Sequence, residues 1–205
     1  MKLIQKWTVF LLGHLIVSYG IVLTIRAELG VAPWDVFHIG LTNQFSLTVG
    51  RAGQVTGFVI ILLSFVVGKI KPTLGTIANM LLIGFMIDGL MLVVSSPTNL
   101  IIRYLYLGLG VIILGFGVGL YISAHCGTGP RDSLMMALDR NLSCDISIVR
   151  GGIEVTALSV GYLLGGPVGI GTILVALGVG PVVSYSLTKI NELKNRFRPK
   201  VDCYN

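Results

Sequence analysis

The stretch AELGVAPWD at residues 27–35 recurs as AHCGTGPRD at residues 124–132, with the common pattern Ala-x-x-Gly-x-small-Pro-x-Asp. Two further blocks match in the same order along the chain. TVGRAG at 48–53 is similar to SIVRGG at 147–152, and LGTI at 74–77 is similar to IGTI at 170–173. Three matched blocks in one order indicate that the chain contains two copies of one structural unit.

The composition predicts a membrane protein. Of 205 residues, 54% are hydrophobic and 12% are charged, and the mean hydropathy is +0.87. Soluble domains carry about 25% charged residues, so the lipid bilayer is the expected surrounding. The net charge of +6 could suit a nucleic acid, but the Lys and Arg residues lie at the ends of apolar runs. These positions indicate how the spans are oriented in the membrane, and no nucleic-acid partner is expected.

Six apolar segments approach the length of about 20 helical residues that crosses a hydrocarbon core. They are Trp7–Ile25, Ala52–Gly68, Thr76–Val94, Leu105–Ser123, Ile148–Gly165 and Gly169–Leu187. The fifth is the weakest because it contains Arg150 and Glu154, so five spans are the alternative. The first is too long for the apolar part of a signal peptide, and we expect an uncleaved span.

The basic residues predict the orientation of six spans. Most of them would lie on one side of the membrane. They stand before the first span, after the second span, in and after the second turn, and in the tail at 189–205. By the positive-inside rule that side is the cytoplasm, so both termini are predicted to be cytoplasmic. The basic tail also suits contact with anionic lipid.

We predict an all-α helical bundle, a single transmembrane domain over residues 1–205. Its two repeats, about 7–97 and 101–188, each have three spans and a short helix after the Gly/Pro/Asp turn. Because an odd number of spans reverses the direction of entry, the repeats are predicted to be inverted. Many secondary transporters have this architecture, with the binding site at the repeat interface.

The turns also carry a resemblance to a known family. The residues concerned are G-x-x-P-W-D at 30–35, GTGPRD at 127–132, LMMAL at 134–138 and GTI at 171–173. On these, the chain resembles the YczE/YyaS/YitT family of bacterial integral membrane proteins, and most of all its YczE branch. The resemblance covers nearly the whole chain. It implies a small polytopic protein of the bacterial plasma membrane without an established reaction, and it brings no set of catalytic residues.

Each turn is predicted to start a short helix. Proline suits the first helical position, so Pro33 and Pro130 are expected to start helices at about 33–42 and 130–140. The glycines before them allow tight turns whose exposed N–H groups attract anions. These glycines are Gly30, Gly127 and Gly129.

The acidic residue of each turn has two interpretations. Asp35 and Asp132 either cap interfacial loops, or belong to re-entrant turns that face each other across a pseudo-two-fold axis. Arg51 and Arg150 each lie about three residues after a predicted N-cap, Thr48 or Ser147, where a cation opposes the helix dipole. We therefore predict the pairs Asp35–Arg51 and Asp132–Arg150. A bound anion and unpaired snorkelling are the alternatives.

Polar residues inside the predicted spans are further candidates, because an intramembrane carboxylate is costly. Asp88 is one, and Asn79 is a neutral polar residue of the same span. Glu154 lies one helical turn after Arg150, and a pair between them is the simplest account of both. His14 is expected to donate a hydrogen bond between helices.

Neither a metal site nor a cofactor is predicted. The three cysteines show no Cys-x-x-Cys spacing, and His38 and His125 occupy different positions in the repeat. The sequence contains no His-Glu-x-x-His or Gly-x-Ser-x-Gly pattern, so an enzyme is not expected. The Gly-x-x-x-Gly patterns at 115–119 and 161–165 are predicted to be helix-packing surfaces.

The leading functional hypothesis is a small permease with its site at the repeat interface. The two helix starts and two arginines favour an anionic solute. The alternative is a non-transporting membrane scaffold or accessory protein, which would lack a polar cavity between the turns. A homo-oligomer is left open. The candidate binding residues are Gly30, Pro33, Asp35, Arg51, Asp88, Gly127, Gly129, Pro130, Arg131, Asp132, Arg150 and Glu154.

Overall fold

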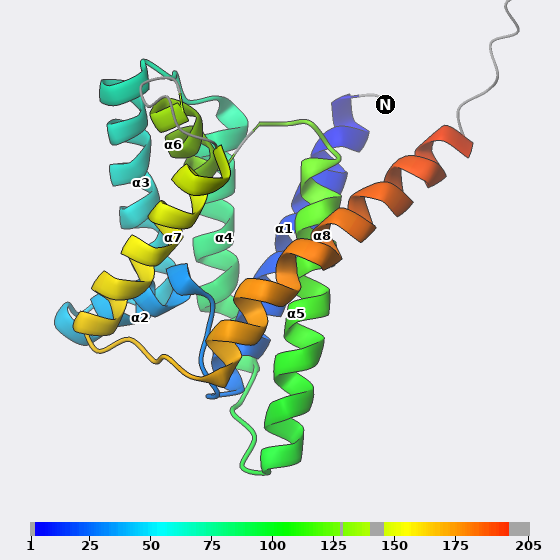
Figure 1. The fold of residues 1–205 in the computed structure, drawn as a ribbon. Helices are drawn as coiled ribbons and strands as arrows, with labels where there is room; N and C mark the ends of the chain where they lie inside the picture. The colour runs from blue at the N-terminus through cyan, green and yellow to red at the C-terminus, as the bar shows by residue number, and fades with distance from the viewer. Residues whose placement is uncertain (1–2, 128, 140–145, 197–205) are drawn as a thin grey trace, which may run out of the picture.

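The computed structural model describes residues 3–127, 129–139 and 146–196, and its elements there are α-helices (Figure 1). In chain order they are α1 (Leu3–Arg26), α2 (Pro33–Gln44), α3 (Val49–Gly68), α4 (Leu74–Val93), α5 (Leu100–Ile122), α6 (Pro130–Asp139), α7 (Ile146–Leu163) and α8 (Ile170–Arg196). The predicted all-α class is confirmed, and the six apolar segments fall on α1, α3, α4, α5, α7 and α8. The predicted end of the second short helix at residue 140 and the tail at 197–205 lie outside the described residues.

Five helices of the described chain are long and apolar enough to cross a membrane. They are α1, α3, α4, α5 and the Ile170–Leu193 part of α8. Helix α7, which contains Arg150 and Glu154, is not among them, so this count matches the five-span alternative and not six. Helix α7 nevertheless runs from the end of the molecule that holds α6 to the end that holds α2 (Figure 1).

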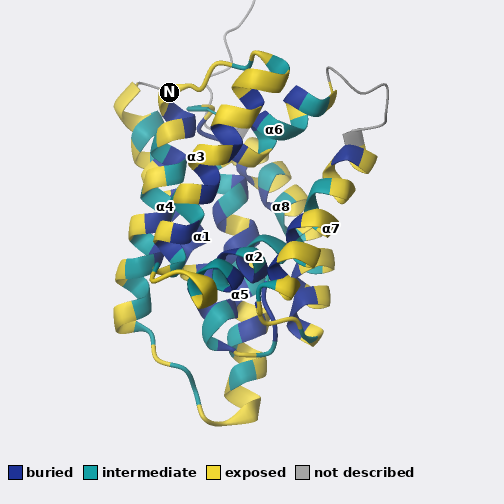
Figure 2. Cartoon of the chain, turned by 90° about the vertical axis from the view of Figure 1, so that its left-hand side faces the viewer, coloured by how far each residue is buried: buried dark blue, intermediate teal, exposed yellow. Residues whose placement is uncertain are grey.

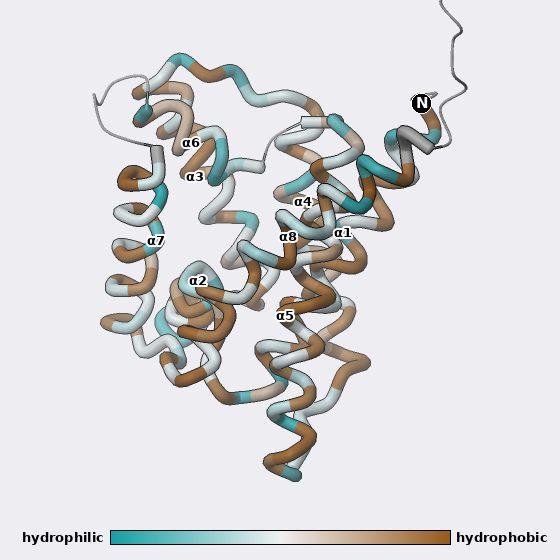
Figure 3. The backbone as a smooth tube through the Cα atoms, turned by 45° about the vertical axis from the view of Figure 1, so that its right-hand side comes forward, coloured by the Kyte–Doolittle hydropathy of each residue, from teal (hydrophilic) through white to brown (hydrophobic). Residues whose placement is uncertain are grey.

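The outer faces of the spans carry large apolar side chains. On α4, for example, Leu92 is 89% exposed and Phe85 is 67% exposed. Exposed residues follow the outside of the helices in Figure 2, and many of the same helices are coloured hydrophobic in Figure 3. Such a surface suits hydrocarbon, so the spans contact the lipid bilayer.

Helices α1 and α5 pack against each other in antiparallel directions through glycines. A Cβ at Gly20 would collide with Leu114, and a Cβ at Gly117 would collide with Val17. Residues 17 and 114 occupy equivalent repeat positions, and so do residues 20 and 117. The contact between residues 20 and 114 therefore recurs between residues 117 and 17, with the two repeats exchanged. A second such set joins Gly13 to Tyr121 and Thr24 to Gly110. Small residues let the backbones approach closely here.

Further glycines pack the other helices. Gly115 and Gly119 of α5 lie against Val182 and Ser186 of α8, which confirms the first predicted packing surface. Gly161 of α7 lies against α2, but Gly165 follows α7 in a turn with φ of 85°. The second predicted surface is therefore only half correct, because the helix ends before its second glycine.

The two Gly/Pro/Asp turns both have positive φ angles at two equivalent described positions. Glu28 and His125 occupy equivalent positions, and each has a φ of 53°. The glycines two residues later, Gly30 and Gly127, have φ values of 102° and 149°. Side chains rarely adopt such angles, so glycine at these positions lets the chain leave one helix and enter the next.

Each turn packs on the start of the last helix of the other half. The N–H of Gly171, at the start of α8, donates to the carbonyl of Leu29 in the first turn at 2.7 Å. In the second turn, a Cβ at Gly75 of α4 would collide with the carbonyl of Cys126. The repeated Gly-Thr-Ile blocks thus supply the glycine that each turn packs against.

Candidate functional site

A cavity of about 760 Å³ lies between the two halves of the chain, and all eight helices contribute to its wall. The first turns of α2 and α6 both open into it. Its polar and charged lining residues are Asp35, His38, Thr56, Asn79, Tyr121, Arg131, Asp132, Arg150, Glu154 and Ser184, with a tryptophan, Trp34, beside them. The remaining wall is mostly aliphatic or glycine. Such a concave space with a few convergent polar groups is the usual form of a small-molecule site.

The first turn places an acidic side chain and an imidazole in this cavity. Pro33 is the first residue of α2, and Asp35 lies in its first turn, where the helix dipole favours a carboxylate. Asp35 is only 4% exposed, and its Oδ1 lies 3.7 Å from Nδ1 of His38. Burial lowers the pKa of His38, with Asp35 opposing that effect, so the ring is neutral at pH 7.

The acidic residue of the second turn accepts a hydrogen bond from within the same turn. Pro130 starts α6, and Oδ2 of Asp132 accepts a hydrogen bond from the N–H of Gly129 at 3.3 Å. Asp132 therefore has the capping contact that one sequence interpretation predicted. It also lines the cavity, so capping and a place in the wall occur together.

Arg131 joins the two turns. Its guanidinium carbon lies 4.5 Å from the centroid of the Trp34 ring, within the range of a cation–π contact. Three carboxylates act electrostatically on Arg131, from Asp35 of the first turn, Asp132 of the second and Glu154 of α7. Trp34 and Arg131 are equivalent positions in the repeat, so the turns meet at their matching residues.

Two further polar side chains continue the wall of the cavity. They are Tyr121 of α5 and Asn79 of α4. The sequence marked Asn79 as a polar residue in a span. Trp34 and Tyr121 were not predicted site residues, because an aromatic residue in an apolar chain carries no distinguishing signal.

The predicted pairing of the turn aspartates with Arg51 and Arg150 is wrong. Arg51 is exposed on α3 and does not line the cavity, and the ion pairs among the described residues include no Arg51–Asp35 pair. Arg150 Nε lies 3.3 Å from Oε1 of Glu154, which confirms the simpler prediction for those two residues. Among the described residues, the ion-pair partner of Asp35 is His38 of its own helix, and Asp35 shares the cavity wall with Arg131 of the other turn.

Asp88 stabilises the start of α3 and lies outside the cavity wall. Its Oδ1 accepts from the N–H of Gly50 at 2.8 Å, and its Oδ2 accepts from the Thr48 hydroxyl at 2.5 Å. The Thr48 hydroxyl in turn accepts from the N–H of Arg51, as an N-cap does. The predicted N-cap at Ser147 is wrong, because α7 already begins at Ile146.

Of the other predicted site residues, some line the cavity and others lie behind the turns. Pro33, Gly129 and Pro130 line the cavity, whereas Gly30 and Gly127 lie behind the turns against α8 and α4. The predicted hydrogen bond from His14 to another helix is wrong. Its Nδ1 lies 2.6 Å from the carbonyl of Phe10 in its own helix, and its ring lies tilted against the Tyr121 ring.

Comparison with known proteins gives relatives over almost the whole chain. Residues 4–187 match a family described as a family of unknown function, DUF6198. The uncharacterized membrane protein YczE of Bacillus subtilis (strain 168) is 37% identical over 195 residues, 95% of this chain and 91% of that protein. An uncharacterized protein of Haemophilus influenzae is 31% identical over 91% of this chain and 85% of its own length.

A third relative is the uncharacterized protein YyaS of Bacillus subtilis, which is 28% identical over 85% of this chain and 89% of its own length. No solved structure matches the chain. The match to the family extends from α1 into α8 and includes both turns. The resemblance predicted from the turn residues is confirmed, and the chain belongs to the DUF6198 family as a multi-pass membrane protein similar to YczE.

Proposed function

We propose that the protein is a small permease and that its solute site is the cavity between the two turns. The observation that carries this proposal is the contact between Trp34 and Arg131, with Asp35 and Asp132 beside it. Helix starts from both halves thereby meet around one polar space inside an apolar bundle. Charged groups at such a place are costly to retain in a membrane protein, and a transported solute is the usual reason for them.

An inverted pair of repeats would give this site alternating access. The reciprocal contacts of α1 with α5 support the inversion. Gly20 contacts Leu114 and Gly117 contacts Val17, so each contact recurs with the two repeats exchanged, as a two-fold axis requires. Helices α2 and α6 lie towards opposite ends of the molecule, which also fits inversion (Figure 1). Transport would then require one half to rock against the other around the fixed turns.

The charge of the cavity favours a cationic solute. Its wall holds three carboxylates, those of Asp35, Asp132 and Glu154, against two guanidinium groups. His38 adds no charge at pH 7 because burial lowers its pKa. One negative charge is therefore in excess, which argues against the anionic solute that the sequence favoured. A small organic amine is the class that fits this balance.

We place both chain ends on the cytoplasmic side. The start of α1 and the end of α8 lie at the same end of the molecule (Figure 1), and Lys6 and Lys189 are near them. The positive-inside rule assigns such basic residues to the cytoplasm. The scaffold alternative predicted no polar cavity between the turns, and the cavity described above does not favour it.

Uptake into liposomes tests the permease. Purified protein would be reconstituted and offered a panel of radiolabelled organic amines, with organic anions of similar size for comparison. We expect uptake of at least one amine, and its loss in Asp35→Asn and in Asp132→Asn. Glu192→Gln is the matched control, because Glu192 is exposed, pairs with Lys189 and does not line the cavity. Equal uptake by Asp35→Asn and Glu192→Gln, or no uptake of any solute, would contradict the proposal.

A further inference from the structure

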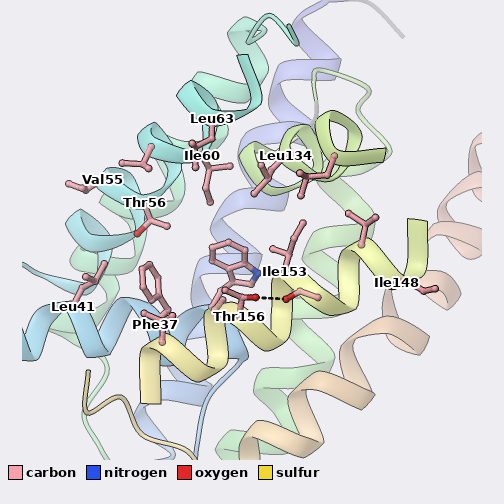
Figure 4. Close-up of a pocket in the computed structure, with 17 residues that line it drawn as sticks. Phe37, Leu41, Val55, Thr56, Ile60, Leu63, Leu134, Ile148, Ile153 and Thr156 are labelled. Atoms are coloured by element: carbon pink, nitrogen blue, oxygen red, sulfur yellow. Dashed lines mark hydrogen bonds between the residues drawn. The ribbon is translucent and has the colours of Figure 1, made fainter. Parts of the chain in front are cut away.

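A second hollow lies beside the polar cavity and is almost wholly apolar. It is a groove of about 800 Å³ between α2, α3, α6 and α7, and Figure 4 shows side chains from all four helices pointing into it. Its lining includes Phe37, Val55, Leu63, Leu134, Ile148 and Val160. A space of this size and chemistry excludes a small hydrophilic solute and accepts hydrocarbon.

The hydroxyl groups in the groove are already satisfied by the helices that carry them. Thr56 donates to the carbonyl of Ala52 at 2.8 Å, and Thr156 donates to the carbonyl of Gly152 at 2.7 Å. Neither hydroxyl hydrogen therefore has to find a partner in the groove. An occupant has no need of a polar group along this part of its length, which again indicates an alkyl chain.

The groove opens on the side that faces lipid. Val55, Val59 and Leu63 line it and are each about half-exposed, on a helix that is one of the candidate membrane spans. Its occupant can therefore come from the bilayer without passing through water. Hydrocarbon chains are the surrounding solvent at this depth.

The groove and the polar cavity share part of their walls. Trp34, Thr56, Ile60 and Ile153 line both spaces. Trp34 is the decisive member, because the Arg131 guanidinium lies over its ring while the same side chain lines the groove. A molecule whose chain follows the groove thus reaches the charged groups at its head end.

We infer that the solute of this protein is a single-chain amphiphile with a cationic head group, such as a long-chain primary amine. Its alkyl chain occupies the groove between α3 and α7, and its head group lies among Asp35, Asp132 and Glu154 in the polar cavity. The continuity of the two spaces at Trp34 and the excess of carboxylates carry the assignment. The inference rests on the proposed permease and names the class of its solute.

Tryptophan quenching tests this binding mode directly. The chain has two tryptophans, so Trp7→Phe leaves Trp34 as the only reporter in the reconstituted protein. The probe is a long-chain primary alkylamine brominated on the part of its chain nearest the head group, since bromine quenches indole fluorescence at contact. We expect the amine to quench Trp34 at a lower mole fraction than the alkyl sulfate with the same brominated chain. In Asp35→Asn this difference between the two head groups should disappear.

Two neighbouring glycines provide a matched pair of variants for the groove. Gly151 and Gly152 lie on α7, and a Cβ at either would meet no other atom within 4 Å, so both accept a larger side chain. Only Gly152 lines the groove. Added to Trp7→Phe, Gly152→Phe should lose most of the quenching by the amine, and Gly151→Phe should retain it.

Several results would overturn the inference. Equal quenching in the Gly151 and Gly152 variants would mean that the chain does not lie in the groove. Equal quenching by brominated phosphatidylcholine and by the amine would mean that the groove holds ordinary bilayer lipid. A second copy of the chain would cover the groove if two results came together. These are no quenching by the amine in Trp7→Phe and a changed oligomeric state in Gly152→Phe. Quenching reports binding alone, so it can fail while small amines are still transported, and the permease would survive that failure.

Discussion

Two aspartates of the first half, Asp35 and Asp88, have contrasting surroundings. Asp35 lies in the cavity wall with Arg131, whereas Asp88 accepts hydrogen bonds at the start of α3. Asp88→Ala should therefore lower stability by about 1 kcal/mol, as the loss of an N-cap partner does. Thermal unfolding in detergent would measure this.

The complementary variant is Asp35→Asn, which should keep the melting temperature and lose amine uptake. It retains the shape of the side chain and removes only its charge. A melting temperature that falls as far in Asp35→Asn as in Asp88→Ala would show that both aspartates serve the fold.

The burial of His38 predicts a pH dependence for the site. Burial lowers its pKa, so the ring is neutral near pH 7 and gains a proton only in more acidic solution. The groups facing it are Asp35 of its own helix and Arg131 of α6. Protonation cancels the excess negative charge of the cavity, so amine uptake should fall as the pH drops through this lowered pKa. His38→Gln cannot be protonated and should lose this acid limb of the uptake profile. An unchanged acid limb in the variant would assign the titration to another group.

Local contacts could be predicted at the residue scale, and long-range contacts could not. The Arg150–Glu154 pair lies within one helical turn, so spacing alone indicated it. The contact of Asp88 with Gly50 and that of Trp34 with Arg131 join distant parts of the chain. No rule based on sequence spacing predicts these two contacts. The same holds for the place of Asp35 in one cavity wall with Arg131 of the other repeat.

Among the elements, the starts of α4 and α8 act as supports for the turns. A Cβ at Gly75 would collide with the carbonyl of Cys126, so Gly75→Ala should push the second turn out of place. Overpacking of this kind costs about 1–3 kcal/mol, and thermal unfolding should show it. Gly89→Ala on the same helix is the control, because a Cβ there would meet no atom within 4 Å. Gly89→Ala should be neutral or stabilising, since alanine favours a helix. Equal destabilisation by both would rule out a specific support.

The sequence predicted the elements well because their signals are local. The prolines placed the starts of α2 and α6, and apolar runs placed the long helices. The number of spans was less certain because α7 combines a helical pattern with two charges. The sequence showed that the Gly-Thr-Ile blocks repeat, but their packing on the opposite turns required the fold.

At the scale of the whole molecule, the repeat predicted two similar halves, and each half does contain a long helix, a short helix and two more long helices. The polar cavity between them followed from the paired turns, but the apolar groove did not. The groove depends on how α7 is spaced from α3, which no feature of the sequence specifies.

Alternating access to the cavity is the central claim, and thiol labelling from the two sides of the membrane tests it most directly. In protein whose three cysteines are replaced by serine, Ser184→Cys would place one thiol in the cavity wall. Ser95→Cys, in the exposed loop between α4 and α5, is the control for a thiol on one side only. We predict that a membrane-impermeant maleimide labels Cys at 184 from either side of sealed vesicles, and Cys at 95 from one side. Labelling at 184 from a single side, or from neither, would contradict the account.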